Sequence, residues 1–256
     1  MSSVTVGMIK VVPEKWEPDT NMALLERLIP AVAAAGARLV ITPECFIDGY
    51  VIHEEHWTPE RFAPMCEPGP DGPRATRLRE LAAESGVYLV AGLSEQRPEG
   101  FFNTAHVIAP DGSLLGQYDK IQPHERYCYG KHLPVFETEF GTMAVVICAD
   151  RRWPEIMRCL RLKGARLIAM PTYGMKGPRN MRWIQTRAYE NCCWVCFAHP
   201  EEGLICDPRG EVAANLVGNE EFLVHTCDLT VTGDEEMLAQ RHPDVYGFAW
   251  ERGEPA

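Results

Sequence analysis

Two kinds of hydrophobic pattern alternate along the chain. Short, continuously apolar runs are typical of buried strands, whereas apolar residues at every third or fourth position are typical of helices. In the first half these patterns predict strands over 4–12, 37–44 and 87–93 and helices over 21–36 and 71–86. Leu24, Leu28 and Val32 share one face of the first helix, which Pro30 should bend or split. The order contains a βαβ unit.

The rest of the chain continues this alternation of strands and helices. The segment "FFNTAHVIAPDGSLLGQYDK" (101–120) alternates around an Asp-Gly turn and predicts a β-hairpin. Beyond it we predict helices over 154–164 and 180–192, strands over 165–171 and 193–198, and a second hairpin over 204–216. Antiparallel pairing therefore interrupts the βαβ pattern in both halves.

A short internal repeat supports a twofold organisation. "GARLVITP" (36–43) and "GARLIAMP" (164–171) align without a gap, 128 residues apart in a chain of 256. Each half is predicted to contain helix, strand and hairpin, and two such halves would form two mixed sheets packed face to face with helices outside. Because no Gly-, Ser- and Pro-rich linker separates the halves, we expect a single domain over residues 1–256.

Composition and charge exclude several classes of protein. With 46% hydrophobic and 24% charged residues the composition is that of a soluble globular protein, and a net charge of −11 argues against a nucleic-acid partner. The first residues lack the features of a signal peptide, and no apolar run is long enough to span a membrane. We therefore expect a cytoplasmic protein with ten reduced cysteines. The C-x-x-C in "CCWVC" (192–196) has no second ligand pair, so no metal site is predicted.

The stretch "VVICADRRWPE" (145–155) places a thiol where a strand ends and a helix begins. A Val/Ile run leads into Cys148, and Pro154 followed by an acid is typical of a helix start. Sites in α/β proteins form at the carboxyl ends of strands, and helix N-termini favour anions such as a thiolate. Cys148 is therefore a candidate nucleophile, although a buried cysteine can also pack simply as a small hydrophobe.

Two further charged residues occupy equivalent strand exits. Glu44 follows the first copy of the repeated strand, and Lys120 follows the second strand of the first hairpin. Glu44 could accept the proton of Cys148, and Lys120 could stabilise both the thiolate and an oxyanion. From the spacing alone, Glu44 could equally well be an exposed acid in a loop. Alternatively, a histidine could activate the Cys148 thiol, but none of the eight histidines forms a recognisable sequence motif with Cys148.

These segments resemble the nitrilase superfamily of carbon–nitrogen hydrolases. "PECFIDGY" matches its glutamate motif with Glu44, "YDKI" its lysine motif with Lys120, and "CADRRWPE" its nucleophile motif with Cys148. "WIQTRAYEN" (183–191) and "QRHPDVY" (240–246) are similar to further family segments, so that the resemblance covers nearly the whole chain.

The resemblance implies an α/β fold, a four-layer αββα sandwich of two mixed sheets, with no cofactor and no metal. It also implies a homodimer or larger homo-oligomer. In the implied reaction Glu44 deprotonates Cys148, which attacks a carbonyl or nitrile carbon. Lys120 and the backbone N–H of Ala149 hold the oxyanion, and a thioester forms and is hydrolysed. A second catalytic glutamate of the family is matched by Glu125 in "HERYCYG", at a shorter spacing from Lys120.

The substrate is less closely defined. Asp150 stands where true nitrilases tend to have Glu, which favours small amides, and "DRRWPE" is similar to the branch that hydrolyses N-carbamoyl amino acids. Arg151 is our first choice to meet a substrate carboxylate, with Arg152 in a structural ion pair, although either could pair with a surface acid. We expect Tyr50 and Tyr173 to bind substrate too. The alternatives are a nitrilase or a catalytically silent binding protein on the same fold.

Overall fold

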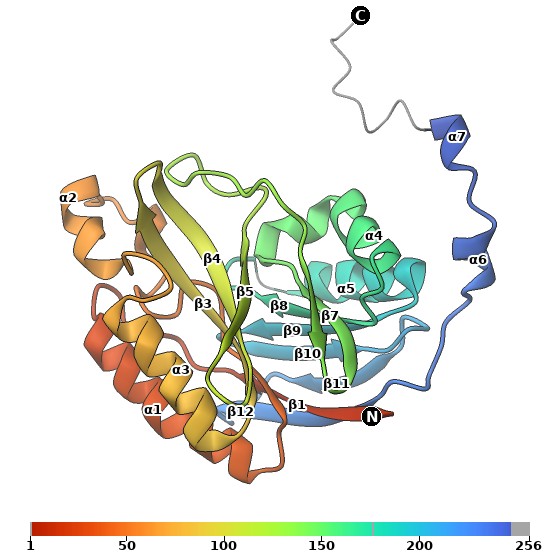
Figure 1. Ribbon diagram of the computed structural model, residues 1–256, viewed down its shortest axis with the longest axis horizontal. Coiled ribbons are helices and arrows are strands. Elements are labelled where there is room, and N and C mark those ends of the chain that lie inside the picture. Colours follow the sequence, from red (N-terminus) through yellow and green to blue (C-terminus); the bar gives the residue numbers. More distant parts are fainter. Residues whose placement is uncertain (1, 176, 247–256) are drawn as a thin grey trace, which may run out of the picture.

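The computed structural model describes residues 2–175 and 177–246, which form two six-stranded sheets with helices on their outer faces (Figure 1). The strands are β1 (Ser3–Ile9), β2 (Leu39–Ile41), β3 (Tyr88–Arg97), β4 (Gly100–Ile108), β5 (Leu114–Asp119), β6 (Val135–Thr138), β7 (Gly141–Val145), β8 (Leu167–Pro171), β9 (Trp194–His199), β10 (Glu202–Cys206), β11 (Val212–Leu216) and β12 (Phe222–Asp228). The helices are α1 (Pro18–Ala34), α2 (Pro59–Phe62), α3 (Pro73–Ser85), α4 (Pro154–Leu162), α5 (Pro178–Asn191), α6 (Glu236–Ala239) and α7 (Pro243–Tyr246). Three short 3₁₀ turns complete the set: η1 (Val51–His53), η2 (Ala63–Met65) and η3 (Cys148–Arg152).

The two sheets have the same topology. The first has the order β12-β1-β2-β3-β4-β5 and the second β11-β10-β9-β8-β7-β6. In each, three parallel strands (β1, β2, β3 and β7, β8, β9) continue into an antiparallel hairpin. In each, a further antiparallel strand, β12 or β6, covers the other side of the first parallel strand. The predicted mixed sheets and pseudo-twofold repeat are therefore confirmed.

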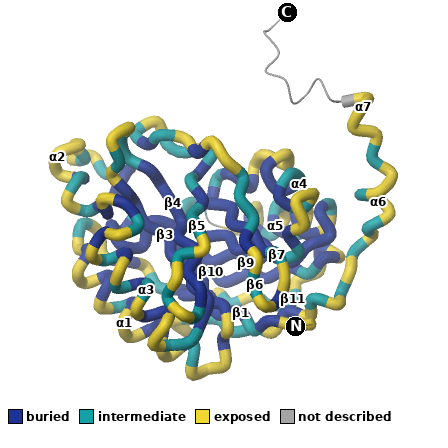
Figure 2. Tube along the Cα trace, in the orientation of Figure 1, coloured by how far each residue is buried: buried dark blue, intermediate teal, exposed yellow. Residues whose placement is uncertain are grey.

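Side chains of alternating strand positions divide the interior into layers. Every second residue of a strand points to the same face, and Leu39 and Ile41 of β2 belong to the core between the sheets, together with Val145 and Ala169 of the second sheet. Val40 points the other way, into the core beneath α1 and α3. A matching core lies between the second sheet and α4 and α5. Figure 2 shows the inner strands as buried and the outer helical faces as exposed. These are the four layers of the predicted αββα sandwich.

Several elements differ in detail from the sequence predictions. Helix α1 is not split, since it runs unbroken from Pro18 to Ala34 with Pro30 inside it. Pro30 is exposed and near the end of the helix, where water can satisfy the carbonyl that loses its partner. Strands β6 and β12 were not predicted, and the strand predicted over 87–93 extends to Arg97.

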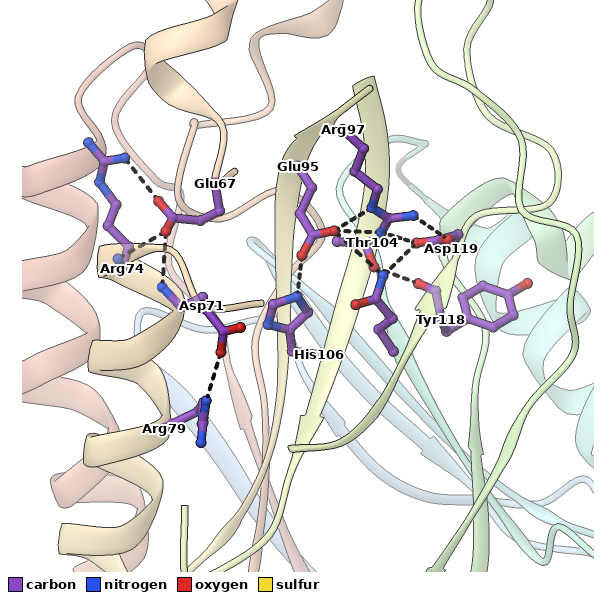
Figure 3. A network of polar contacts seen from close by, with 12 residues as sticks. Glu67, Asp71, Arg74, Arg79, Glu95, Arg97, Thr104, His106, Tyr118 and Asp119 are labelled. Carbon is purple, nitrogen blue, oxygen red and sulfur yellow. Dashed lines mark hydrogen bonds and ion pairs between the residues drawn. The ribbon is translucent and has the colours of Figure 1, made fainter. Parts of the chain in front are cut away.

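A buried polar network ties the ends of β3, β4 and β5 together (Figure 3). Glu95 and His106 are both fully buried, with Glu95 Oε1 2.6 Å from His106 Nε2, and Arg97 Nε donates to Glu95 Oε2. Arg97 also donates two hydrogen bonds of 2.7 Å to the carboxylate of Asp119. Burial would raise the pKa of Glu95, but its bonds to His106 and Arg97 outweigh burial and lower that pKa. The network fixes the end of β5, immediately before Lys120.

Among residues 2–175 and 177–246, none of the helices combines the length and the apolar character that crossing a membrane requires. The homo-oligomer and the cytoplasmic location stay predictions.

Candidate active site

Alternation along the strands of the first sheet directs two polar side chains into the space between the sheets. Tyr118 of β5 belongs to the core between the sheets and Asp119 to the outer network, so Lys120 points inward again. Asn103 of β4 lies opposite Lys120, whose backbone N–H donates to the Asn103 carbonyl at 2.9 Å. The two side chains therefore face the same space.

Glu44 lies at the centre of this group and is fully buried. Its Oε1 accepts hydrogen bonds from Lys120 Nζ and, at 2.8 Å, from Asn103 Nδ2. Its Oε2 accepts the backbone N–H of Tyr173 at 3.1 Å. Burial would lower the pKa of Lys120, but the negative charge of Glu44 and its hydrogen bond oppose burial and the pKa is raised, so Lys120 remains an ammonium ion.

The two copies of the repeated sequence end beside each other at this point. The Glu44 backbone N–H lies 3.4 Å from the carbonyl of Thr172, and the two residues follow Pro43 and Pro171, the last residues of the two repeats. The loop after β2 thus reaches the loop after β8 across the two sheets. This contact brings Glu44 from the first half to the strand ends of the second half.

Cys148 follows β7 and opens the turn η3, where it has a φ of 45°. A residue other than glycine rarely adopts this conformation, which is often found at functional sites. Burial raises the pKa of the Cys148 thiol, and the charge of Glu44 raises it further. Lys120, Arg151 and the Tyr173 N–H oppose this rise without reversing it. The resting thiol is therefore protonated at neutral pH and needs a base to react.

Asp150 connects the Cys148 turn to the loop that follows Lys120. It is fully buried, accepts the Tyr118 hydroxyl at 2.7 Å, and accepts the backbone N–H groups of Ile121 and Gln122 at 3.1 and 2.7 Å. Burial raises the pKa of Asp150, and the hydrogen bond from Tyr118 opposes that rise. Asp150 therefore holds two segments of the site together and does not face the cavity.

Lys120 and Cys148 line one cavity of about 440 Å³. Its lining also includes Tyr50, Ile52, His53, Asn103, Gln122, Pro123, His124, Tyr127, Ala149, Arg152, Trp153, Gly174 and Met175. The described lining contains no Asp or Glu side chain. Burial and the neighbouring His124 lower the pKa of His53. Arg152 is a cation of this wall, and no carboxylate of the described residues pairs with it.

Of the residues predicted to bind the substrate or its oxyanion, Ala149 and Tyr50 line the cavity, whereas Tyr173 packs against Tyr50. Ala149 lines the cavity at the start of η3, where a backbone N–H has no partner within the turn. Tyr50 lines the cavity, and its ring stacks on that of Tyr173 with centroids 4.3 Å apart and 13° between the planes. Tyr173 supports Tyr50 and uses its backbone N–H to bind Glu44.

The two arginines after Cys148 are placed opposite to the prediction. Arg151 is fully buried, and its guanidinium donates to Cys148 Sγ at 3.4 Å and to Asn180 Oδ1 at 2.9 Å. It lies behind the thiol, outside the lining of the cavity. Arg152 is exposed and lines the cavity, with Nη2 2.8 Å from Met175 Sδ. The choice of Arg151 over Arg152 for a substrate carboxylate is therefore corrected: the 3₁₀ turn points the second arginine outward.

Glu125 is not brought to the other three predicted catalytic residues. It is exposed, and it lines a neighbouring cavity of about 800 Å³ formed by residues 121–133. The histidine before it, His124, lines both this cavity and the Cys148 cavity. The short loop after Lys120 turns His124 inward and Glu125 outward.

The sequence analysis did not identify Asn103, His53 or His124 as site residues. Alternation within the predicted hairpin places Asn103 on the same face as Lys120, and this was the one available signal. The two histidines meet edge to face, 4.6 Å apart, from loops far apart in the sequence. Within the described ranges 2–175 and 177–246, no group of three or more His, Cys, Asp or Glu side chains is arranged to hold a metal ion.

All of these site residues fall within one segment that matches a known family. Residues 5–234 match the family described as Carbon-nitrogen hydrolase. The chain belongs to the carbon–nitrogen hydrolase family. The resemblance to the nitrilase superfamily is thereby confirmed. As a member of this family, the protein is a hydrolase of carbon–nitrogen bonds.

Similar proteins include other members of the family. The chain is 33% identical over 233 residues to a nitrilase of Pyrococcus abyssi, covering 85% of this chain and 87% of the relative. It is 31% identical over 252 residues to the omega-amidase NIT2 of Xenopus tropicalis, covering 86% and 88%. Its fold is similar to that of a mutant amidase from Nesterenkonia AN1, with a TM-score of 0.83, 22% identity and coverage of 97% and 98%.

In this carbon–nitrogen hydrolase, Gly92 of β3 sets the position of Glu44. A Cβ at Gly92 would lie 2.5 Å from the Pro43 carbonyl oxygen and 3.0 Å from Glu44 Cα, closer than packed atoms allow. Gly92→Ala should therefore displace Glu44, lowering kcat about a hundredfold and the free energy of unfolding by about 1–3 kcal/mol. Steady-state kinetics and urea unfolding would measure the two effects.

The matched control is Gly203→Ala on β10 of the other sheet. Its Cβ would meet only the side chains of Leu223 and Met8 at 3.3 Å or more, which can adjust. Its kcat should stay within about twofold of the wild type. Equal kcat values for Gly92→Ala and the wild type would contradict this assignment.

Proposed function

We propose that this carbon–nitrogen hydrolase cleaves a small amide or N-carbamoyl compound through a thioester on Cys148. The observation that carries the proposal is that Lys120 and the protonated thiol of Cys148 line one cavity, while the buried Glu44 carboxylate binds Lys120 and acts electrostatically on the thiol. Such an arrangement supplies a nucleophile, a base and a cation within reach of a single substrate carbon.

In the first half of the proposed reaction the Cys148 sulfur attacks the carbonyl carbon while its proton passes to Glu44. The carbonyl oxygen becomes an oxyanion, which the Lys120 ammonium and the Ala149 N–H stabilise. Glu44 then returns the proton to the leaving nitrogen as the C–N bond breaks. Ammonia or an amine departs, and the acyl group remains on sulfur as a thioester.

In the second half, water attacks the thioester carbon and gives a proton to Glu44. The C–S bond breaks, the acid leaves, and the proton held by Glu44 returns to sulfur. Glu44 thus serves twice as base and twice as acid. Its three hydrogen bonds keep the carboxylate aimed in one direction throughout.

The names of similar proteins support amides and carbamoyl compounds as the substrate class. They include the omega-amidase NIT2 and, over 60% of this chain, an N-carbamoylputrescine amidase of Solanum lycopersicum. In the Nesterenkonia amidase, the mutated glutamate and cysteine are separated by the same number of residues as Glu44 and Cys148. A nitrile is the second candidate substrate, because the Pyrococcus abyssi relative is a nitrilase.

We propose further that Arg152 binds a carboxylate of the substrate. It contributes a permanent cation to a cavity whose described lining has no acidic side chain, and a guanidinium can hold a carboxylate through two hydrogen bonds. A substrate with its amide carbon at Cys148 and its acid group at Arg152 would span the cavity.

The nucleophile is tested by ammonia release from a panel of amides, N-carbamoyl amino acids and nitriles. Cys148→Ala should abolish turnover of every substrate that the wild type accepts, with the fold retained, because only one sulfur atom is removed. Iodoacetamide should inactivate the wild type and label Cys148, as read by peptide mass spectrometry. Cys159→Ala, on the outer helix α4, is the control and should keep full activity. Retained activity in Cys148→Ala would exclude the mechanism.

Mutation of Glu44 should affect hydrolysis of the substrate but not alkylation of Cys148. Glu44→Gln should lower kcat by about 10²–10⁴-fold, because the leaving nitrogen no longer receives a proton. Alkylation of Cys148 by iodoacetamide needs no such proton and should persist, since loss of the Glu44 charge lowers the pKa of the thiol. Glu125→Gln is the matched control, and its kcat should be close to that of the wild type. Loss of alkylation along with hydrolysis would show that Glu44→Gln had disturbed Cys148 itself.

If Arg152 binds a substrate carboxylate, its mutation should lower kcat/KM only for substrates that carry a carboxylate. Arg152→Leu should reduce kcat/KM about ten- to a hundredfold for N-carbamoyl amino acids, the effect of one charge-assisted hydrogen bond. Neutral amide analogues should be nearly unaffected. Arg151→Leu, which removes a group that contacts the sulfur, should reduce kcat/KM for both classes alike. Equal losses on both classes for Arg152→Leu would rule out carboxylate binding at this position.

A further inference from the structure

Two buried hydroxyl groups connect the carboxylate of Asp48 to the wall of the Cys148 cavity. Ser94 Oγ donates to Asp48 Oδ2 at 2.7 Å and lies 2.7 Å from the hydroxyl of Tyr127, whose side chain lines the cavity. All three residues are buried. The proposed reaction uses none of them.

Asp48 also organises the turn between Glu44 and the cavity wall. Its Oδ1 accepts the backbone N–H of Val51 at 3.2 Å, at the start of η1. In this turn Cys45 and Tyr50 both have positive φ values, 46° and 57°, so the backbone is held away from its preferred conformations. The Asp48 carboxylate binds this turn at Val51 and the neighbouring strand β3 at Ser94.

Residues of the proposed active site lie at both ends of this turn. Glu44 precedes Cys45, and Tyr50 forms part of the cavity wall. The Tyr50 ring stacks on Tyr173, whose backbone N–H binds Glu44 Oε2. A change at Asp48 can therefore reach Glu44 by two routes, along the chain and through the stacked rings.

The groups around Asp48 are thiols, phenols and a second carboxylate. The titratable groups that face it are the thiols of Cys45 and Cys66 and the phenols of Tyr50 and Tyr127, with the Glu44 carboxylate nearby. In the described part of the chain no lysine or arginine pairs with it. Burial raises the pKa of Asp48 to about 7, although hydrogen bonds from Ser94 and from the Val51, Asp48 and Tyr50 backbone lower it.

We propose that Asp48 is a positioning residue of the active site, and that its ionised form holds the 44–51 turn and the Ser94–Tyr127 hydroxyl chain in the arrangement that supports turnover. The inference rests on the proposed function, because it concerns the same cavity. In the ionised form, Tyr127 donates to Ser94 and Ser94 donates to Asp48. In the protonated form, whose proton comes from solvent, Asp48 donates to Ser94 and Ser94 to Tyr127. The Tyr127 hydrogen then turns toward Cys45 Sγ, 3.6 Å away.

The activity should therefore rise as pH increases through the pKa of Asp48. Below that pKa the acid is protonated and the hydroxyl chain is reversed; above it the carboxylate accepts its hydrogen bonds. We expect kcat/KM of the wild type to rise about tenfold between about pH 5 and about pH 9, the effect of one hydrogen bond, with a midpoint near pH 7. Asp48→Asn, whose amide donates to Ser94 as the protonated acid does, should stay at the low level and lack this rise.

Two further variants make the test specific. Ser94→Ala breaks the hydroxyl chain but leaves the bond between Asp48 and the Val51 N–H. It also removes a hydrogen bond that lowers the pKa of Asp48, so the rise that remains should have its midpoint at higher pH. Asp71→Asn, at an exposed acid outside the cavity, should keep the wild-type profile. An unchanged rise in Asp48→Asn, or an unmoved midpoint in Ser94→Ala, would overturn the proposal. If Asp48→Asn does not fold, the Ser94→Ala midpoint decides.

A spectroscopic titration separates this inference from the proposed reaction. Infrared difference spectra of Cys148→Ala should show the band of a protonated buried carboxyl that disappears as pH rises through about 7, and the band should be missing when Asp48→Asn is added. This measurement does not depend on turnover. Absence of the band overturns the role of Asp48, whereas activity in Cys148→Ala would instead overturn the proposed function.

Discussion

The ion pair between Glu44 and Lys120 is the interaction around which the rest of the site is organised. Removing a carboxylate and an ammonium ion from water costs several kcal/mol per ion, and their attraction offsets this only when further hydrogen bonds are made. Asn103 and the Tyr173 N–H supply those bonds to Glu44. The bonds come from different elements, so the pair can exist only where the ends of β2, β5 and β8 meet the first residues of β4.

The two-sheet architecture brings these strand ends together. The paired repeats place the ends of β2 and β8 side by side, and alternation along β4 and β5 directs Asn103 and Lys120 inward. Asp150 then ties the nucleophile turn to the loop after Lys120, while the Glu95–Arg97–Asp119 network holds β5 from the other face. Rigid elements therefore fix every member of the site, as a site that transfers protons within one cavity requires.

The sequence predicted those parts of the fold and site that depend on regular periodicity. Glu44, Lys120 and Cys148 each follow a predicted strand, so the strand ends alone made them candidates, and the resemblance to a known family implied that they form one site. Arg151 and Arg152 could not be ordered, because the direction of a side chain in a 3₁₀ turn depends on the φ of 45° at Cys148, which no local pattern reveals. The same limit applies to His124 and Glu125, which are adjacent in sequence although only His124 lines the Cys148 cavity. Strand β12 was missed because its half-buried residues carry little of the apolar signal of a central strand.

The pairing of β12 with β1 has a consequence for the order in which the protein can fold. The two strands join the beginning of the described chain to a segment more than two hundred residues later, with Ser3 opposite Asp228 and Ile9 opposite Phe222. During synthesis β1 emerges before the other described strands, and the edge that β12 will cover remains without that partner until β12 has been made. An unpaired strand edge is a template for association with other chains. The first half of this molecule, although it repeats the topology of the second, therefore cannot complete its own sheet and depends on the last strand to close it.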